Sequence, residues 1–187
     1  PIAVGFPADD NPWLFDMATS AIPWNRVQLY RSLGETLPSG IASNEDGMDE
    51  TDPNKADMLA PLGGAFGFKG AGLGGVAEIF SAVMTGMRIS PDLMSMDAAD
   101  MSTPRELGAF IIALDPSAFL AAGIFDAGMR HYLASLRGSP AREGMRVMAP
   151  GDREWAEAAR RQIDGIPVDP ATRRAFDDLA DRTGISL

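Results

Sequence analysis

A glycine-rich segment that contains a lysine offers the most specific chemistry in this sequence. Residues 61–72 read Pro-Leu-Gly-Gly-Ala-Phe-Gly-Phe-Lys-Gly-Ala-Gly, and the apolar residues that follow recur at helical spacing up to Gly86. Glycines let backbone N–H groups approach a ligand, and the positive end of a helix dipole attracts anions. Lys69, one of two lysines, adds a cation that can meet a phosphate or a carboxylate. The alternative is that the glycines only allow a helix to pack tightly on a sheet.

The ordinary dinucleotide fingerprint is not expected at this place. Residues 70–75 match the pattern G-x-G-x-x-G. That pattern must close a strand and be followed by an acidic residue about 20 positions on, and neither condition is met here.

Two further places could receive a ligand. Asp16, Thr19 and Ser20 lie where an apolar strand gives way to polar residues, which is where ligand groups collect in α/β proteins. The alternative there is a helix cap. Gly151 and Asp152 precede a helical pattern, so Asp152 is expected to cap that helix, whose free N-terminus can also receive an anion.

Several classes of function are disfavoured by composition. The 187 residues contain 26 acidic and 16 basic side chains, a net charge of −10, which argues against nucleic acid and anionic membrane surfaces as partners. There is no cysteine, and His131 is the single histidine, so no metal site is expected. No apolar run approaches the roughly 20 residues that span a bilayer, and a cytoplasmic location is expected.

Strands and helices alternate along the chain, which predicts an α/β fold with a mixed sheet flanked by helices. Apolar runs predict a buried strand after Pro1, a second strand at 12–17 that forms a hairpin or a neighbouring strand pair with it, and a central strand at 109–114. Helical patterns cover 24–33, 117–136, 152–163 and 169–183, the last capped by Asp169, and residues 38–61 form a long surface loop.

Six segments taken together resemble one protein family. They are residues 1–4, 14–20, 61–64, 68–70, 150–154 and 164–167. This is the malate/L-lactate dehydrogenase family of non-Rossmann NAD(P)-dependent oxidoreductases, which includes ureidoglycolate and sulfolactate dehydrogenases and piperideine-2-carboxylate reductases. The resemblance implies that family's fold, incomplete without an N-terminal region that carries a proton-donating histidine.

The resemblance also implies which residues act. Contacts to NAD or NADP are implied for Phe15, Asp16, Met17, Ala18, Thr19, Ser20, Ala21, Phe68, Lys69, Gly70, Gly151 and Asp152. Asp16 is the implied catalytic residue, working with the histidine of the missing region. Two features depart from the family pattern: residues 65–68 lengthen the loop before Lys69, and Ala109 stands where a histidine is common.

Residues 1–148 are therefore expected to form a cofactor-binding α/β domain and residues 149–187 a pair of C-terminal helices. The expected function is that of a C-terminal part, or subunit, of an NAD(P)-dependent oxidoreductase acting on a small 2-oxo acid, 2-hydroxy acid or cyclic imino acid. Its expected partners are the N-terminal region or a companion chain, in a homodimer of the complete unit. The alternatives are a cleaved two-chain relative with hydrolase or lyase chemistry at Pro1, and a non-catalytic dimerising relative.

Overall fold

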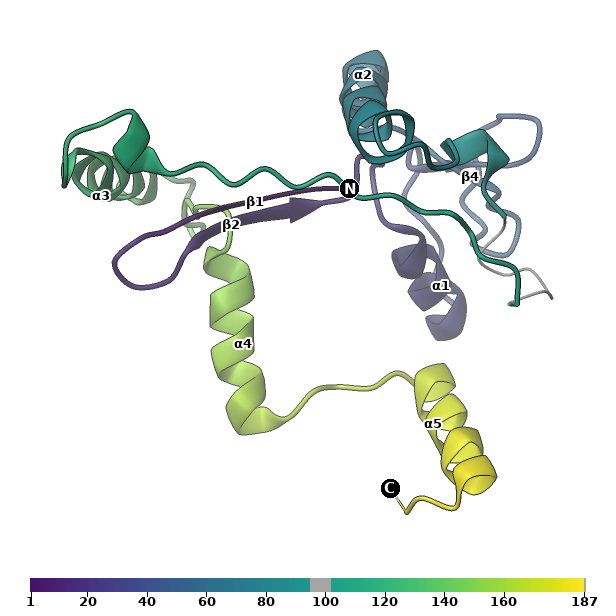
Figure 1. Ribbon diagram of the computed structural model, residues 1–187. Coiled ribbons are helices and arrows are strands. Elements are labelled where there is room, and N and C mark those ends of the chain that lie inside the picture. The colour runs from purple at the N-terminus through teal and green to yellow at the C-terminus, as the bar shows by residue number, and fades with distance from the viewer. Residues whose placement is uncertain (95–101, 187) are drawn as a thin grey trace. The chain divides into compact units, whose positions relative to one another are not determined.

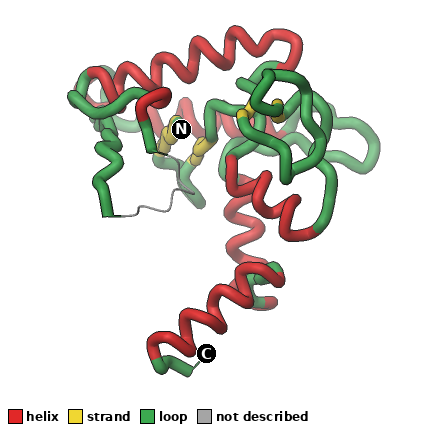
Figure 2. The backbone as a smooth tube through the Cα atoms, turned by 90° about the vertical axis from the view of Figure 1, so that its right-hand side faces the viewer, coloured by secondary structure: helices red, strands yellow, loops and turns green. Residues whose placement is uncertain are grey.

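A computed structural model describes residues 1–94 and 102–186 of the chain (Figure 1). Its elements are β1 (Ile2–Phe6), β2 (Trp13–Met17), α1 (Trp24–Leu33), β3 (Ala42–Ser43), β4 (Met58–Leu59), α2 (Gly67–Glu78), α3 (Ile124–Arg137), α4 (Asp152–Asp164) and α5 (Pro170–Thr183). A π-helix at Ile79–Val83 directly follows α2. Figure 2 shows how short the strands are beside the helices.

The chain divides into two compact units, which are described separately. The first unit comprises Pro1–Met17 and Gly75–Arg160, and the second comprises Ala18–Gly74 and Arg161–Leu187. The functional division predicted between residues 148 and 149 stays a prediction.

In the first unit, β1 and β2 form the predicted hairpin. They pair antiparallel, in a register that runs from Ile2 opposite Met17 to Phe6 opposite Trp13 (Figure 1). The rings of Phe6 and Trp13 pack with centroids 5.4 Å apart. The prediction that the first strand is buried is wrong, since Val4 is 37% and Phe6 39% exposed. The sheet has only two strands among the described residues, so much of its surface stays open.

The predicted central strand at 109–114 is not a strand in the structure. Ile111 is 88% and Ile112 64% exposed, and no strand of the described residues pairs with this segment. Apolarity alone cannot make a strand, because its backbone N–H and C=O groups need a neighbouring strand to bond to. One anchor is present: the Phe110 ring packs on that of Phe80 in the π-helix, with centroids 4.9 Å apart.

Helix α3 begins later than predicted. The sequence predicts a helix from Ser117, but α3 begins at Ile124, and only Pro116–Ala118 form a separate 3-10 turn before it. Gly123, with φ 79°, takes the left-handed conformation that interrupts a helix. The prediction overlooked this break because the apolar spacing continues across it.

In the second unit, α1 and the segment after it share a small core. Val27, Leu37, Ala42 and Ala56 are buried together. The prediction that residues 38–61 are a surface loop is therefore incomplete: this stretch supplies Ala42 and Ala56 to the core and pairs β3 with β4. Isolated small apolar residues between turn signals do not stand out in a sequence, although they pack as closely as large ones.

Candidate functional site

In the second unit, the predicted ligand-binding segment Ala18–Ala21 is fixed against residues 60–62. The Ala21 N–H donates to the Ala60 carbonyl at 2.7 Å, and the Leu62 N–H donates to the Thr19 carbonyl at 3.3 Å. Ser20 forms an isolated antiparallel bridge with Pro61. The segment is thus held by its backbone beside the start of the glycine-rich stretch, and Thr19 and Ser20 do not cap α1, whose N-cap is Pro23.

Glycines let α2 lie directly on this segment. Gly70 is buried, and a Cβ placed there would lie 2.1 Å from the Leu62 carbonyl oxygen. A Cβ on Gly74 would lie 3.5 Å from Oγ1 of Thr19. Close packing of a helix, the alternative left open by the sequence, therefore accounts for Gly70. The same packing brings two predicted groups, Ala18–Ala21 and Phe68–Gly70, together.

Lys69 lies in the first turn of α2 rather than in a loop before the helix, and its side chain is exposed. Its Nζ is 5.6 Å from the ring centroid of Phe66. Phe66 and Phe68 are 62% and 70% exposed and meet edge to face. No carboxylate of residues 1–94 or 102–186 forms an ion pair with Lys69. Its cation, at the positive end of a helix, suits an anionic ligand.

In the first unit, the turn before α4 is docked on β2, the strand that carries Phe15, Asp16 and Met17. The Leu14 N–H donates to the Pro150 carbonyl at 3.2 Å. Gly151 has φ 96°, and a Cβ on it would lie 3.1 Å from the Leu14 nitrogen. A residue with a side chain would therefore be strained at position 151 and would crowd β2. Asp16 itself is exposed on the strand.

The carboxylate of Asp152 faces back from α4 instead of capping it. Arg137 donates to it twice, Nε to Oδ2 at 3.0 Å and Nη2 to Oδ1 at 2.6 Å, and the Ala149 N–H donates to Oδ2 at 2.9 Å. These bonds, the one from Arg137 foremost, lower the pKa of Asp152 below its ordinary value. The prediction that Asp152 caps the helix is wrong, because the guanidinium of Arg137 engages both carboxylate oxygens.

A cavity of about 960 Å³ in the first unit lies beside this pair. The hairpin turn at 7–11, one face of α3, residues 146–148 and the start of α4 line it. Asp152 is the one predicted site residue in the lining. The cavity lining carries both charge signs and includes a second ion pair, with Arg130 Nη1 at 3.4 Å from Asp9 Oδ1.

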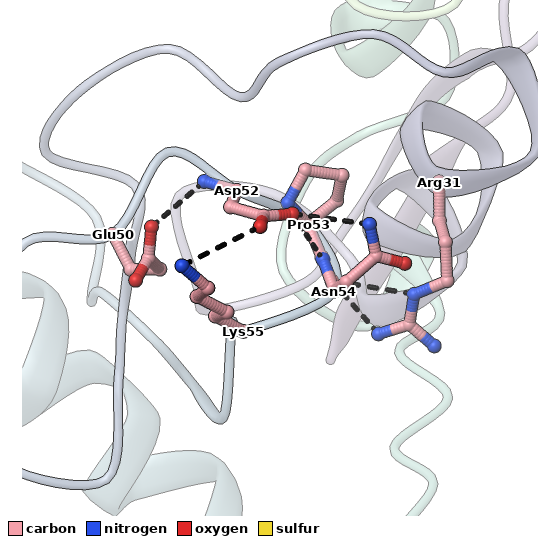
Figure 3. Close-up of polar contacts among 6 residues, drawn as sticks. All are labelled: Arg31, Glu50, Asp52, Pro53, Asn54 and Lys55. Carbon is pink, nitrogen blue, oxygen red and sulfur yellow. Dashed lines mark hydrogen bonds and ion pairs between the residues drawn. The ribbon is translucent and has the colours of Figure 1, made fainter.

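Another polar cluster, around Asp52 in the second unit, has a structural role (Figure 3). The guanidinium of Arg31 donates to the Pro53 carbonyl at 2.8 and 3.3 Å. Asp52 accepts from the Asn54 N–H at 2.9 Å and lies 4.0 Å from Lys55 Nζ. The Asn54 hydrogen bonds lower the pKa of Asp52. The hydrogen bonds among these groups hold a loop closed, and few of their donors and acceptors remain available to a ligand.

The described parts of the chain contain no candidate metal site: no three histidine, aspartate or glutamate side chains there lie close enough to hold a metal ion. His131 is an exposed residue of α3. Within the same residues, none of the helices has the length and apolarity needed to cross a bilayer.

Comparison with known proteins decides the family. The family model for malate/L-lactate dehydrogenase matches residues 1–177. The chain belongs to this family. It is 28% identical, over 100% of its length, to malate/(S)-sulfolactate dehydrogenase of Methanothermus fervidus, of which it covers 53%. It is 32% identical, over 91% of its length, to Delta(1)-pyrroline-2-carboxylate reductase 1 of Burkholderia ambifaria, of which it covers 49%.

Solved structures of the malate/L-lactate dehydrogenase family have the same fold. The malate dehydrogenase of Entamoeba histolytica superposes with a TM-score of 0.85 at 25% identity, covering 99% of this chain and 55% of that one. A dehydrogenase of Sinorhizobium meliloti gives 0.81 at 34% identity, covering 96% and 50%. The α/β class and the predicted family fold are thereby confirmed. The chain spans about half the length of the curated relatives it matches.

The sequence missed two residues that shape the candidate site. Leu62 underlies Gly70, and Arg137 holds Asp152. Arg137 precedes Gly138 at the end of a helical pattern, where a basic residue is usual. Nothing in the spacing links it to Asp152, so no local signal could have shown the pair.

Proposed function

We propose that the protein to which these residues belong is an NAD(P)-dependent oxidoreductase of the malate/L-lactate dehydrogenase family. In the second unit, the packing of α2 onto Thr19 and Leu62 carries the proposal, because it brings the helix turn that carries the exposed Lys69 onto the backbone that is held beside the segment Ala18–Ala21. Matched relatives named as dehydrogenases and reductases support it.

Each of the binding groups has a physical task. Lys69 holds phosphate, and the exposed rings of Phe66 and Phe68 offer apolar contact to a flat base. Within the first unit, the family resemblance supports nucleotide contacts from Asp16 on β2 and from the main chain at Gly151 and Asp152. A nicotinamide, when bound, supplies or accepts the hydride.

The proposed substrate is a small 2-oxo acid, 2-hydroxy acid or cyclic imino acid. The relatives' names, malate/(S)-sulfolactate dehydrogenase and pyrroline-2-carboxylate reductase, support this class. We assign the proton transfer to a histidine outside these 187 residues, in an N-terminal region or a companion chain, and the orientation of that histidine to Asp16. The complete unit is proposed to act as a homodimer.

Calorimetric titration of the complete protein with NADH and NADPH tests this function. Measurable affinity for one of them, followed by its substrate-dependent oxidation with pyrroline-2-carboxylate or oxaloacetate, is the expected result. Absence of affinity for either nucleotide in a folded sample would overturn the proposal and favour a non-catalytic or non-redox relative.

A further inference from the structure

We propose that Arg137 is a positioning residue for the turn Ala149–Asp152, which precedes and begins α4. It clamps the Asp152 carboxylate, and the clamped carboxylate fixes the turn against β2. The inference rests on the proposed function, because its consequence is tighter binding of a nicotinamide nucleotide at that turn.

Both carboxylate oxygens of Asp152 are occupied. Oδ1 accepts from Nη2 of Arg137 at 2.6 Å, while Oδ2 accepts from Nε of Arg137 at 3.0 Å and from the Ala149 N–H at 2.9 Å. The fork of a guanidinium matches the two oxygens of a carboxylate, which makes such pairs both strong and directional. The Asp152 side chain is only 21% exposed.

The clamp reaches β2 through three consecutive residues. Ala149 is 4% exposed, and its carbonyl accepts from the Asp152 N–H at 3.0 Å, so side chain and backbone of Asp152 close the same turn. Within that turn, the Pro150 carbonyl accepts from the Leu14 N–H, and Gly151 lies so close to Leu14 that a Cβ would crowd it. A displaced Asp152 therefore displaces the backbone that meets β2.

This geometry changes the role expected for Asp152. Three donors already engage both oxygens of its carboxylate, so we assign its contact to a nucleotide to the main chain and not to the side chain. The residue that sets this backbone lies on a different helix, α3. Binding at the turn thus depends on Arg137, which itself is not a predicted contact.

An ordinary surface ion pair would behave differently. Arg137 is 43% exposed, and exposed pairs contribute little to stability. Arg130 provides the matched control, because it lies on α3, lines the same cavity and pairs with Asp9 at 3.4 Å without touching residues 149–152. A purely structural role predicts similar effects for both arginines.

The test compares Arg137→Gln, Arg137→Lys and Arg130→Gln in the complete protein. Hydrogen exchange at the Ala149 amide reports on the turn, and titration with NADH and NADPH reports on binding. We expect Arg137→Gln to accelerate exchange at Ala149 and to weaken nucleotide binding by about 10- to 100-fold, as misplaced supporting groups do. Arg137→Lys should retain part of the exchange protection at Ala149 and part of the nucleotide affinity. Arg130→Gln should leave both quantities unchanged.

Each other outcome overturns the inference in a distinguishable way. If the unaltered protein binds a nucleotide and Arg137→Gln binds it as tightly, the positioning role fails while the proposed function stands. If the unaltered protein binds no nucleotide, the proposed function fails and the inference fails with it.

Should Arg137→Gln not fold, Asp152→Asn replaces it, since the amide keeps an acceptor for Ala149 but loses the charge that holds Arg137.

Discussion

The hydroxyl of Ser32 in α1 donates to Oδ1 of Asp169 at 2.7 Å, across 137 positions of the sequence. The same oxygen accepts from the Ala171 and Thr172 N–H groups at 3.0 and 3.2 Å, so Asp169 caps α5 as predicted. One carboxylate therefore starts a helix and ties it to another helix of the second unit.

Protonation of Asp169 is expected to loosen α5. Its hydrogen bonds, from Thr172 first and then Ser32, hold the pKa of Asp169 far below its ordinary value. A depressed folded-state pKa gives stability that is full above the unfolded-state pKa and is lost as the pH falls below about 4. Asp169→Asn should therefore be less stable at neutral pH and lose less stability on acidification, as measured by urea unfolding from pH 7 downward. Asp177→Asn, which removes an exposed partner of Arg173 on the same helix, should retain the acid dependence.

Two glycines of α2 should respond to alanine with opposite signs. Gly70→Ala forces a Cβ onto the backbone of Leu62 and should destabilise the protein by about 3 kcal/mol, the upper part of the range for overpacking. Gly72 has nothing within 4 Å of a Cβ, so Gly72→Ala should stabilise the helix by roughly 0.5–1 kcal/mol. Urea unfolding of both variants measures this. Equal effects would mean that α2 does not rest on Leu62.

Removing the cation of Lys69 should weaken nucleotide binding. Loss of one charge-assisted hydrogen bond to phosphate corresponds to about a 10-fold increase in Kd. Lys69→Met is compared with Lys55→Met, which removes the only other lysine, one that lies near Asp52. Titration at two salt concentrations provides the readout: the difference between the variants should shrink as salt rises. Equal affinities would remove Lys69 from the phosphate site.

Arg31 is expected to close the loop that it contacts in Figure 3. Arg31→Gln loses its bonds to the Pro53 carbonyl, at a cost of about 1 kcal/mol, and should accelerate amide exchange at Lys55 and Ala56. Arg26→Gln on the same helix, which loses only a contact with the Tyr30 ring, should leave this exchange unchanged. Unaltered exchange in Arg31→Gln would show that the loop closes without it.

Elements with local signals could be predicted from the sequence. Asp169 and Pro170 mark the start of α5, Gly184 marks its end with φ 69°, and alternating turn and strand residues mark the first hairpin. In each case the residues that decide the structure are neighbours in the chain. The predicted helix ending near Gly86 is likewise found, as α2 followed by the π-helix.

What depends on distant partners could not be predicted in this way. Residues 109–114 have the composition of a strand, but among the described residues no strand pairs with them. The local sequence predicts Asp152 as a helix cap, but in the structure its carboxylate binds the distant Arg137. The family resemblance implies only that Ala18–Ala21 and Phe68–Gly70 each contact the cofactor, and no periodicity in the sequence links segments so far apart. Their roles in cofactor binding stay predictions.

The π-helix after α2 has a consequence for chain length. The Met84 N–H donates to the Ile79 carbonyl, one residue farther along than in an α-helix. The Met87 N–H donates to the Ala82 carbonyl around Gly86, whose φ of 70° ends the helix. The turn thus stores one surplus residue at the C-terminal end of the hydrogen-bond ladder of α2. A single-residue deletion between Ile79 and Val83 would let this last turn close as α-helix, and the register of α2 before it would stay intact because the added residue lies at the helix end.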